Sequence, residues 1–297
     1  MKTTFLTTYF EADGSGVQAQ ARCRPWWLYA NLLSLDAPVV AVVWLGVFSR
    51  AFESSVNASV YAVLFLAVWS IYIADRLVDG LRQKNWRLAA ARHRFVHRHQ
   101  KRFIGLMLVI LPLTAVIALT TLPIDLIVAG CILGAAVVLY FTAFVRLFPK
   151  MKPLRAKEFA CGFVFAVGTS FGVDAVRHGV MTDLARVISA ILLFAALCIY
   201  NCLIIAARER HSDQANDPAS ASVWWKYLDR DLAVFGTILI MASGIGWSLS
   251  SLFFIYPACF VSAVALASVH FFHHRISDSM SRVLVDVALL SPLLLLI

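Results

Sequence analysis

Two pairs of carboxylates stand where long apolar segments end. Asp75 and Asp79 close one apolar run, and Glu209 and Asp213 close another. The spacing of four residues places both carboxylates of a pair on one helical face, one turn apart. Converging carboxylates repel one another unless cations balance them, and Mg²⁺ binds through a few carboxylates together with phosphate oxygens of a substrate. The residue types therefore indicate a site for Mg²⁺ and a diphosphate.

The chemistry that such a site supports is the departure of diphosphate from an organic substrate. A metal ion and neighbouring cations stabilise the charge on the leaving group, and an apolar bundle holds an isoprenoid chain and keeps water from a carbocation. A single pair has a plainer explanation, a solvated helix end with local ion pairs such as Asp79 with Arg82. Two pairs at equivalent positions favour the site.

The segments that must position these acids are membrane helices. Of the 297 residues, 61% are hydrophobic and 14% are charged, against about 45–50% and about 25% in soluble domains. The apolar runs are continuous, which favours an all-α polytopic membrane protein over a barrel. We predict a segment 1–25 before the membrane and a single transmembrane domain 26–297. About nine spans are expected within it, at residues 28–49, 56–77, 103–122, 124–145, 158–174, 184–206, 232–251, 253–272 and 281–297.

The net charge of +9 gives the predicted orientation. Most of the 26 Lys and Arg residues precede the first span or lie in segments 80–102, 146–157 and 208–230. Cytoplasmic loops collect Lys and Arg, so we predict a multi-pass cell-membrane protein with its N-terminus in the cytoplasm and its C-terminus outside. The basic stretch 92–102 lies against the bilayer and suits anionic lipid headgroups, so no nucleic-acid partner is expected.

Asp36 is an acid inside the first predicted span, followed closely by Pro38. The proline is expected to loosen the helix and free a carbonyl group. Asp36 then has two explanations that the sequence leaves open: it lines the cavity and acts on an acceptor proton, or it hydrogen-bonds to a neighbouring helix. Asp286, in the last span, is expected to make a packing or partner contact. The six cysteines read as small packing residues.

From about Leu28 onward the chain resembles the UbiA superfamily of intramembrane prenyltransferases. That family has nine helices and two acidic motifs after its second and sixth helices, which Asp75 with Asp79 and Glu209 with Asp213 match. The Lys/Arg-rich segment 152–158 before the small residues of the fifth span is similar as well. The resemblance implies Mg²⁺-dependent transfer of a prenyl group from a polyprenyl diphosphate to an aromatic or lipid acceptor.

The resemblance also implies roles for individual residues. The two acid pairs would hold Mg²⁺ and the diphosphate, and Tyr72, with Asp36, would line the acceptor side of the cavity. The diphosphate contacts would be Arg82, Lys157, Arg208, Arg210 and Asn201. The leading residues of the first family motif fall on Ile71 and Tyr72, so the acidic motifs are reduced. The alternatives are a terpene cyclase that acts on the prenyl diphosphate alone and a non-catalytic or transport membrane protein.

Overall fold

The protein is described by a computed structural model over residues 25, 27–82, 91–139, 157–174, 176, 184–217, 220–250 and 254–296. In these ranges the chain is helical and has no strand, which confirms the predicted all-α class. The helices are α1 Leu28–Leu32, α2 Asp36–Ala51, α3 Ala58–Arg82, α4 Ala91–Arg98, α5 Gln100–Thr121, α6 Ile124–Leu139, α8 Lys157–Ser170, α10 Leu184–Arg208, α11 Arg210–Asn216, α12 Ala221–Trp224, α13 Leu228–Leu249, α14 Ile255–Phe271, α15 Asp278–Ala288 and α16 Leu293–Leu296, with a short 3₁₀ turn at His273–Arg275.

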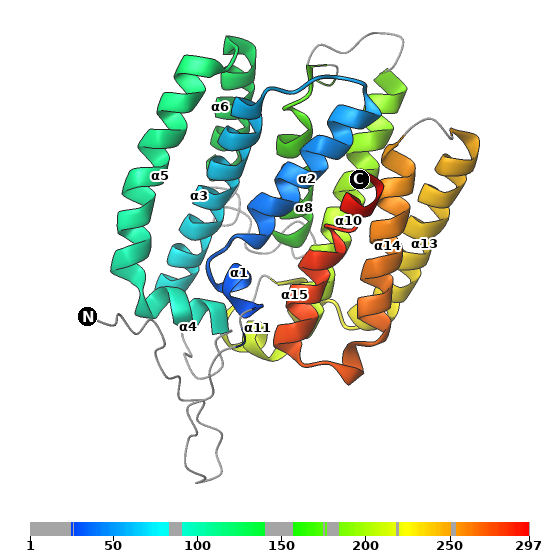
Figure 1. Cartoon of the computed structure of the whole chain (residues 1–297). Helices are drawn as coiled ribbons and strands as arrows, with labels where there is room; N and C mark the ends of the chain where they lie inside the picture. The colour runs from blue at the N-terminus through cyan, green and yellow to red at the C-terminus, as the bar shows by residue number, and fades with distance from the viewer. Residues whose placement is uncertain are drawn as a thin grey trace.

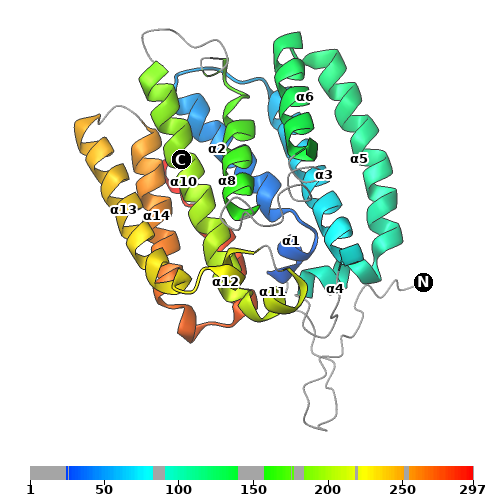
Figure 2. The same cartoon turned by 180° about the vertical axis from the view of Figure 1, so that it is seen from behind.

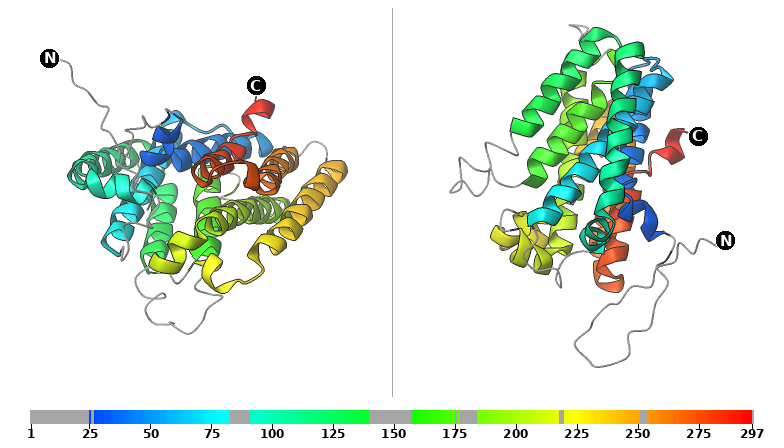
Figure 3. Two further views of the ribbon diagram at one scale, coloured as in Figure 1. Left: turned by 90° about the horizontal axis from the view of Figure 1, so that it is seen from below. Right: turned by 90° about the vertical axis from the view of Figure 1, so that its left-hand side faces the viewer.

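The long helices stand side by side, and the short helices α4, α11 and α12 lie together at one end of the bundle (Figures 1 and 2). We call this end the acidic end, because α3 and α10 finish there with Asp79 and, just beyond α10, Glu209. Seen from below, α10 lies in the interior of the bundle (Figure 3). It packs against α8, α13, α14 and α15. The second acid pair, Glu209 and Asp213, therefore follows directly after the end of this central helix.

Every predicted span contains a helix, but the first span is interrupted at Ser34 and the ninth between Ala288 and Leu293. Ser34, between α1 and α2, has a φ of 60°, in the left-handed region where a continuous helix cannot run. Asp36 restarts the helix, and its Oδ1 accepts a hydrogen bond from the Ala37 backbone N–H at 3.0 Å. Pro38 lies in the first turn of α2, where the missing N–H has no helical partner to lose, and the helix is interrupted four residues earlier at Ser34.

Close contact between α8 and α10 depends on a small residue. A Cβ atom at Gly162 would lie 2.6 Å from the backbone N of Ile199, so only glycine fits at this crossing. Ala166, one turn further along α8, is fully buried. Small residues at these positions let the two helix backbones approach each other. The contact fixes the start of α8, where Lys157 and Glu158 lie, against the end of α10.

Large apolar side chains face outward on the long helices. Leu119 on α5 is 71% exposed and Ile124 on α6 is 72% exposed, and α6 has no buried residue. An apolar surface of this kind suits lipid better than water. Among the helices that the structure describes, five are long and apolar enough to cross a membrane: Ala58–Gly80, Gln100–Thr121, Leu184–Arg208, Leu228–Leu249 and Asp278–Leu296.

Candidate functional site

The acidic end gathers charged and hydroxyl side chains from six parts of the chain. Helices α3, α4, α8 and α15 each bring ionisable residues, the α10–α11 junction brings three acids, and the start of α12 brings two serines. The residues are Asp75, Asp79, Arg92, His93, Lys157, Glu158, Glu209, Asp213, Asp217, Ser220, Ser222 and Arg282.

Two arginines hold the carboxylate of Glu209. Arg92 Nη2 donates to Glu209 Oε2 at 2.8 Å, and Arg92 Nη1 and Arg282 Nη1 both donate to Oε1. We call these three residues the Glu209 clasp. Arg92 lies on α4 and Arg282 on α15, so one carboxylate joins three elements. The three side chains are only 13–16% exposed, and the ion pairs are therefore shielded from solvent. In this arrangement both carboxylate oxygens of Glu209 accept hydrogen bonds from arginine side chains.

Helical spacing continues through the break at Glu209. The Asp213 backbone N–H donates to the Glu209 carbonyl at 2.9 Å, and the Asp217 N–H donates to the Asp213 carbonyl at 2.7 Å. The three acids therefore follow one another at successive turns. Asp217 also forms an ion pair with Lys157 at the start of α8. Sequence reasoning stopped at Asp213 and missed Asp217, although the same four-residue step would have found it.

Asp213 is held by two hydroxyl groups. Ser220 Oγ donates to Asp213 Oδ2 at 2.7 Å and Ser222 Oγ donates to the same oxygen at 3.0 Å. Burial, followed by the negative charge of Glu209, raises the pKa of Asp213 to about 7, while Ser220 and Lys157 act in the opposite direction. A carboxyl of this kind exchanges its proton near neutral pH. It is the kind of group that gives up a proton when a metal ion binds.

Lys157 and Arg92 lie within the field of both acid pairs. Burial alone would lower the pKa of Lys157, but Asp217, Asp79 and Asp75 together raise it well above its ordinary value. Burial likewise opposes the charge of Arg92, and Glu209, Asp79 and Asp213 raise its pKa. Each cation therefore responds to acids from α3 and from the α10–α11 junction. The structure brings the two pairs to one end of the bundle, around two permanent positive charges.

His93 is the buried neighbour of these cations on α4. Its side chain is 8% exposed, and Nδ1 has no hydrogen-bond partner among the residues of the described ranges. Burial, reinforced by Arg92, Arg76 and Lys157, lowers the pKa of His93 to about 2. The imidazole is therefore neutral at physiological pH. This buried face shows that α4 packs onto the acidic end, whereas its basic stretch was predicted to contact lipid headgroups.

Of the predicted diphosphate contacts, two bond to residues outside the acid cluster and one has a side chain outside the described residues. Arg208 forms an ion pair with Asp229 in the first turn of α13. Asn201 Nδ2 donates to the carbonyl of Val285 on α15 at 3.2 Å, inside the bundle. The side chain of Arg82 lies outside the described residues. Arg210 is the first residue of α11 and is partly buried. Lys157 is a predicted diphosphate contact that pairs with an acid of the cluster, Asp217.

Both residues predicted for the acceptor side of the cavity lie near a buried arginine. Asn31 Nδ2 donates to Asp36 Oδ2 at 2.6 Å, and Arg76 Nη2 lies 3.9 Å from the same oxygen. Tyr72, one turn before Arg76 on α3, lies within the electrostatic influence of Asp36. Asp36 therefore hydrogen-bonds to α1 and lies near Arg76 of α3, as the second of the two explanations expects.

The carboxylates of the acidic end are the kind of ligand that Mg²⁺ prefers, but they do not form a closely packed group of ligands. In the parts of the chain that the structure describes, no three His, Cys, Asp or Glu side chains meet closely enough to cage a metal ion. Mg²⁺, however, commonly uses only one or two carboxylates and takes its other ligands from water and substrate phosphates. The carboxylate oxygens of Asp79 and Asp213 are donors of the kind that this mode of binding uses. The predicted Mg²⁺ site remains a prediction.

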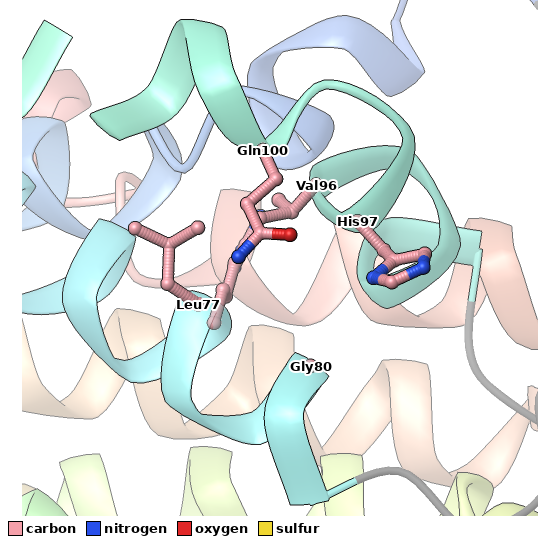
Figure 4. Close-up of a pocket in the computed structure, with 6 residues that line it drawn as sticks. Leu77, Gly80, Val96, His97 and Gln100 are labelled. Carbon is pink, nitrogen blue, oxygen red and sulfur yellow. The ribbon is translucent and has the colours of Figure 1, made fainter. Parts of the chain in front are cut away.

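A small pocket lies beside the cluster, between the end of α3 and the α4–α5 corner (Figure 4). It is lined by Arg76, Leu77, Gly80, Val96, His97 and Gln100. Its volume of about 10 Å³ holds about one water molecule. This pocket is therefore too small for a diphosphate or an aromatic acceptor, and it is not the proposed site.

No protein-family model, curated protein or solved structure is significantly similar to this chain.

Proposed function

We propose that this protein is an intramembrane prenyltransferase that transfers a prenyl group from a polyprenyl diphosphate to an aromatic or lipid acceptor with Mg²⁺. The observation that supports the proposal is the gathering of carboxylates and cations at the acidic end, where Lys157 pairs with Asp217, and Arg92 and Arg282 pair with Glu209, one helical turn before Asp213. Asp79 lies within the electrostatic influence of Lys157 and Arg92. We also propose that all nine predicted segments cross the membrane and form a bundle like that of the UbiA superfamily. The acidic end would then face the cytoplasm, where diphosphates are available.

The charge balance of the cluster supports a diphosphate ligand. Acids alone would repel a diphosphate, and cations alone would provide no ligands for Mg²⁺. Here Lys157 and Arg92 lie among carboxylates, so they can bind phosphate oxygens while Asp79 and Asp213 hold a divalent cation. Bound Mg²⁺ supplies Lewis-acid stabilisation to the leaving diphosphate. Lys157 and Arg92 would donate hydrogen bonds that become stronger as negative charge develops on the leaving diphosphate.

The two arginines of the Glu209 clasp are further candidate ligands for the diphosphate. Arg92 and Arg282 share one carboxylate, so the single negative charge of Glu209 faces two guanidinium charges. The negative charge of a bound diphosphate would balance the second guanidinium charge. The planar guanidinium group of arginine binds phosphate oxygens through two parallel N–H donors. We therefore add Arg92 and Arg282 to Lys157 as the diphosphate-binding residues of the proposed site.

The surrounding bundle supplies the apolar compartment. Helices α3, α8 and α10 rise from the acidic end with apolar side chains over most of their length. A prenyl chain would enter beside them with its diphosphate at the acidic end. The exclusion of water protects a prenyl cation from hydrolysis.

The test is diphosphate release by purified protein in lipid nanodiscs with Mg²⁺ and geranylgeranyl diphosphate. Acceptors are supplied in separate reactions as 4-hydroxybenzoate, as a total lipid extract, and as buffer alone. We expect Asp79→Asn and Asp213→Asn to lower release about 10²-fold, as is typical when a charge-stabilising group is removed. Asp278→Asn is the matched control, because Asp278 is exposed at the start of α15.

The products separate the alternatives. A prenylated acceptor supports the transferase. A cyclic hydrocarbon or alcohol formed in buffer alone would instead indicate a terpene cyclase on the same site. Wild-type release by both Asp79→Asn and Asp213→Asn, or no release by any protein, would overturn the proposed function.

A further inference from the structure

Glu158 is a buried carboxylate at the acidic end that the proposed function does not use. It lies in the first turn of α8 and is 5% exposed. Its Oε1 accepts a hydrogen bond from the backbone N–H of Ala221, the first residue of α12, at 3.2 Å. Its other oxygen, Oε2, is buried and has no hydrogen-bond partner within the described ranges. A carboxylate is costly to bury, and one kept at such a place indicates a function.

The residues on either side of Ala221 hold Asp213. Ser220 Oγ donates to Asp213 Oδ2 at 2.7 Å, and Ser222 Oγ donates to it at 3.0 Å. Both serines are fully buried, and their Oγ atoms lie 3.0 Å apart. The Ser222 backbone N–H also donates to Ser220 Oγ at 3.4 Å. The hydrogen bond to Glu158 therefore fixes the backbone that lies between the two hydroxyl groups.

Both hydroxyl groups bond to the same carboxylate oxygen of Asp213. Hydrogen bonds on Oδ2 set the rotation of the carboxyl group and leave Oδ1 for another ligand. Carboxylates that bind metal ions are commonly held in this way, and the loss of a supporting hydrogen bond typically lowers metal affinity or activity about 10–100-fold. The arrangement around Asp213 is therefore that of a supported metal ligand.

Helix α8 gives Glu158 a fixed position from which to act. Gly162, one turn further along α8, lies against the backbone of Ile199 on α10, so the two helices cannot shift freely. We propose that Glu158 is a positioning residue, which holds Ser220 and Ser222 on Oδ2 of Asp213 through the backbone of Ala221 and so keeps Oδ1 available to Mg²⁺. This inference rests on the proposed function, in which Asp213 is a Mg²⁺ ligand.

Mn²⁺ binding tests the positioning role without substrate or turnover. Mn²⁺ takes the same carboxylate ligands as Mg²⁺, and the electron paramagnetic resonance signal of the free ion measures its binding to protein in phosphatidylcholine nanodiscs. Glu158→Met has a similar length but no carboxyl oxygen, so we expect about 10–100-fold weaker binding. Glu158→Gln keeps Oε1 as an acceptor and loses no hydrogen bond at Oε2. Its affinity should stay within about twofold of wild type, because the supporting hydrogen bond remains.

Two further variants complete the comparison. Asp213→Asn marks the site and should weaken Mn²⁺ binding. Ser262→Ala is the matched control, because it removes a fully buried hydroxyl group that hydrogen-bonds with Ser291, away from Asp213. It should bind Mn²⁺ as the wild type does. Thermal unfolding checks that each variant folds, and if Glu158→Met does not, the double variant Ser220→Ala with Ser222→Ala replaces it with the same expected weakening.

Three results would overturn the positioning role. The first is wild-type Mn²⁺ affinity in folded Glu158→Met or in the double variant. The second is equal weakening in Glu158→Gln and Glu158→Met, which would assign the effect to the negative charge of Glu158 and not to its hydrogen bond. The third is the absence of Mn²⁺ binding by the wild type, or unchanged binding by Asp213→Asn, either of which would remove Asp213 as a ligand.

Turnover separates this inference from the proposed function. In the diphosphate-release assay, Glu158→Met should raise the Mg²⁺ concentration for half-maximal release about 10–100-fold. At saturating Mg²⁺ its KM for geranylgeranyl diphosphate should match that of the wild type. An unchanged Mg²⁺ requirement would overturn the positioning role while leaving the prenyltransferase intact. If no protein releases diphosphate, the proposed function fails, and Mn²⁺ binding still decides whether Glu158 positions Asp213.

Discussion

At the scale of single residues, Asp213 is a group whose charge changes near neutral pH. Its pKa of about 7 lies well above the ordinary value of about 4 for an aspartate. Burial is the main cause and the neighbouring charge of Glu209 is the second. Because the folded protein keeps this proton to a higher pH than the unfolded chain does, the stabilising contribution is full below about pH 4. It is lost as the pH rises through about 7.

We therefore expect the melting temperature of Mg²⁺-free protein to fall as the pH rises from about 4 to about 7. Asp213→Asn removes the titrating group and should make the melting temperature less dependent on pH over this interval. Thermal unfolding in nanodiscs, followed by intrinsic fluorescence, measures both proteins at each pH. The same dependence in the variant as in the wild type would assign the change to other residues.

At the scale of elements, the crossing of α8 and α10 decides whether Lys157 reaches the acid cluster. Gly162 lies against the backbone of Ile199 at this crossing, where the obstructing atoms cannot rotate away as a side chain can. Any added atom must push the two helices apart. Lys157 lies little more than one turn from Gly162 on α8, so the displacement reaches the site.

Gly162→Ala should accordingly destabilise the protein by about 1–3 kcal/mol, the usual cost of overpacking. Gly130→Ala on α6 is the matched control, because nothing lies within 4 Å of its added Cβ, and alanine favours the helix. Unfolding in a detergent–denaturant titration compares the two variants. The prediction fails if Gly162→Ala is as stable as Gly130→Ala.

The helices could be predicted from the sequence because each apolar segment is long enough to be identified without its neighbours. Their interruptions could not, since the left-handed Ser34 lies within an apolar run that continues on both sides. The acids of the site were also identifiable from their four-residue spacing. The partners of those acids were not: whether Arg208 turns to Asp229 or to the cluster depends on how α10 and α13 pack.

At the scale of the whole molecule, the distribution of charge predicts which end of the bundle faces the cytoplasm. Ser279, at the start of α15, lies toward the acidic end, and Ser55, between α2 and α3, lies toward the other end. Both are exposed. The two serines therefore offer reporters for the two sides of the membrane.

We expect a membrane-impermeant thiol reagent to label Ser279→Cys only from the cytoplasmic side and Ser55→Cys only from outside. The variants are made in a background in which the six native cysteines are replaced. Labelling is compared in intact cells and in inverted vesicles. Labelling with the opposite sidedness would reverse the predicted orientation and place the diphosphate site on the wrong side for a cytoplasmic substrate.

The Glu209 clasp has a consequence for the order in which the chain is made. Arg92 is 117 residues from Glu209 in one direction, and Arg282 is 73 residues from it in the other. During synthesis, Glu209 and Arg92 emerge and meet before α15 exists. The second arginine arrives only with the last long helix, so the acidic end is completed at the close of translation. A chain shortened before α15 would keep its earlier helices and their acids, yet lack the contact that ties them to the C-terminal part of the bundle.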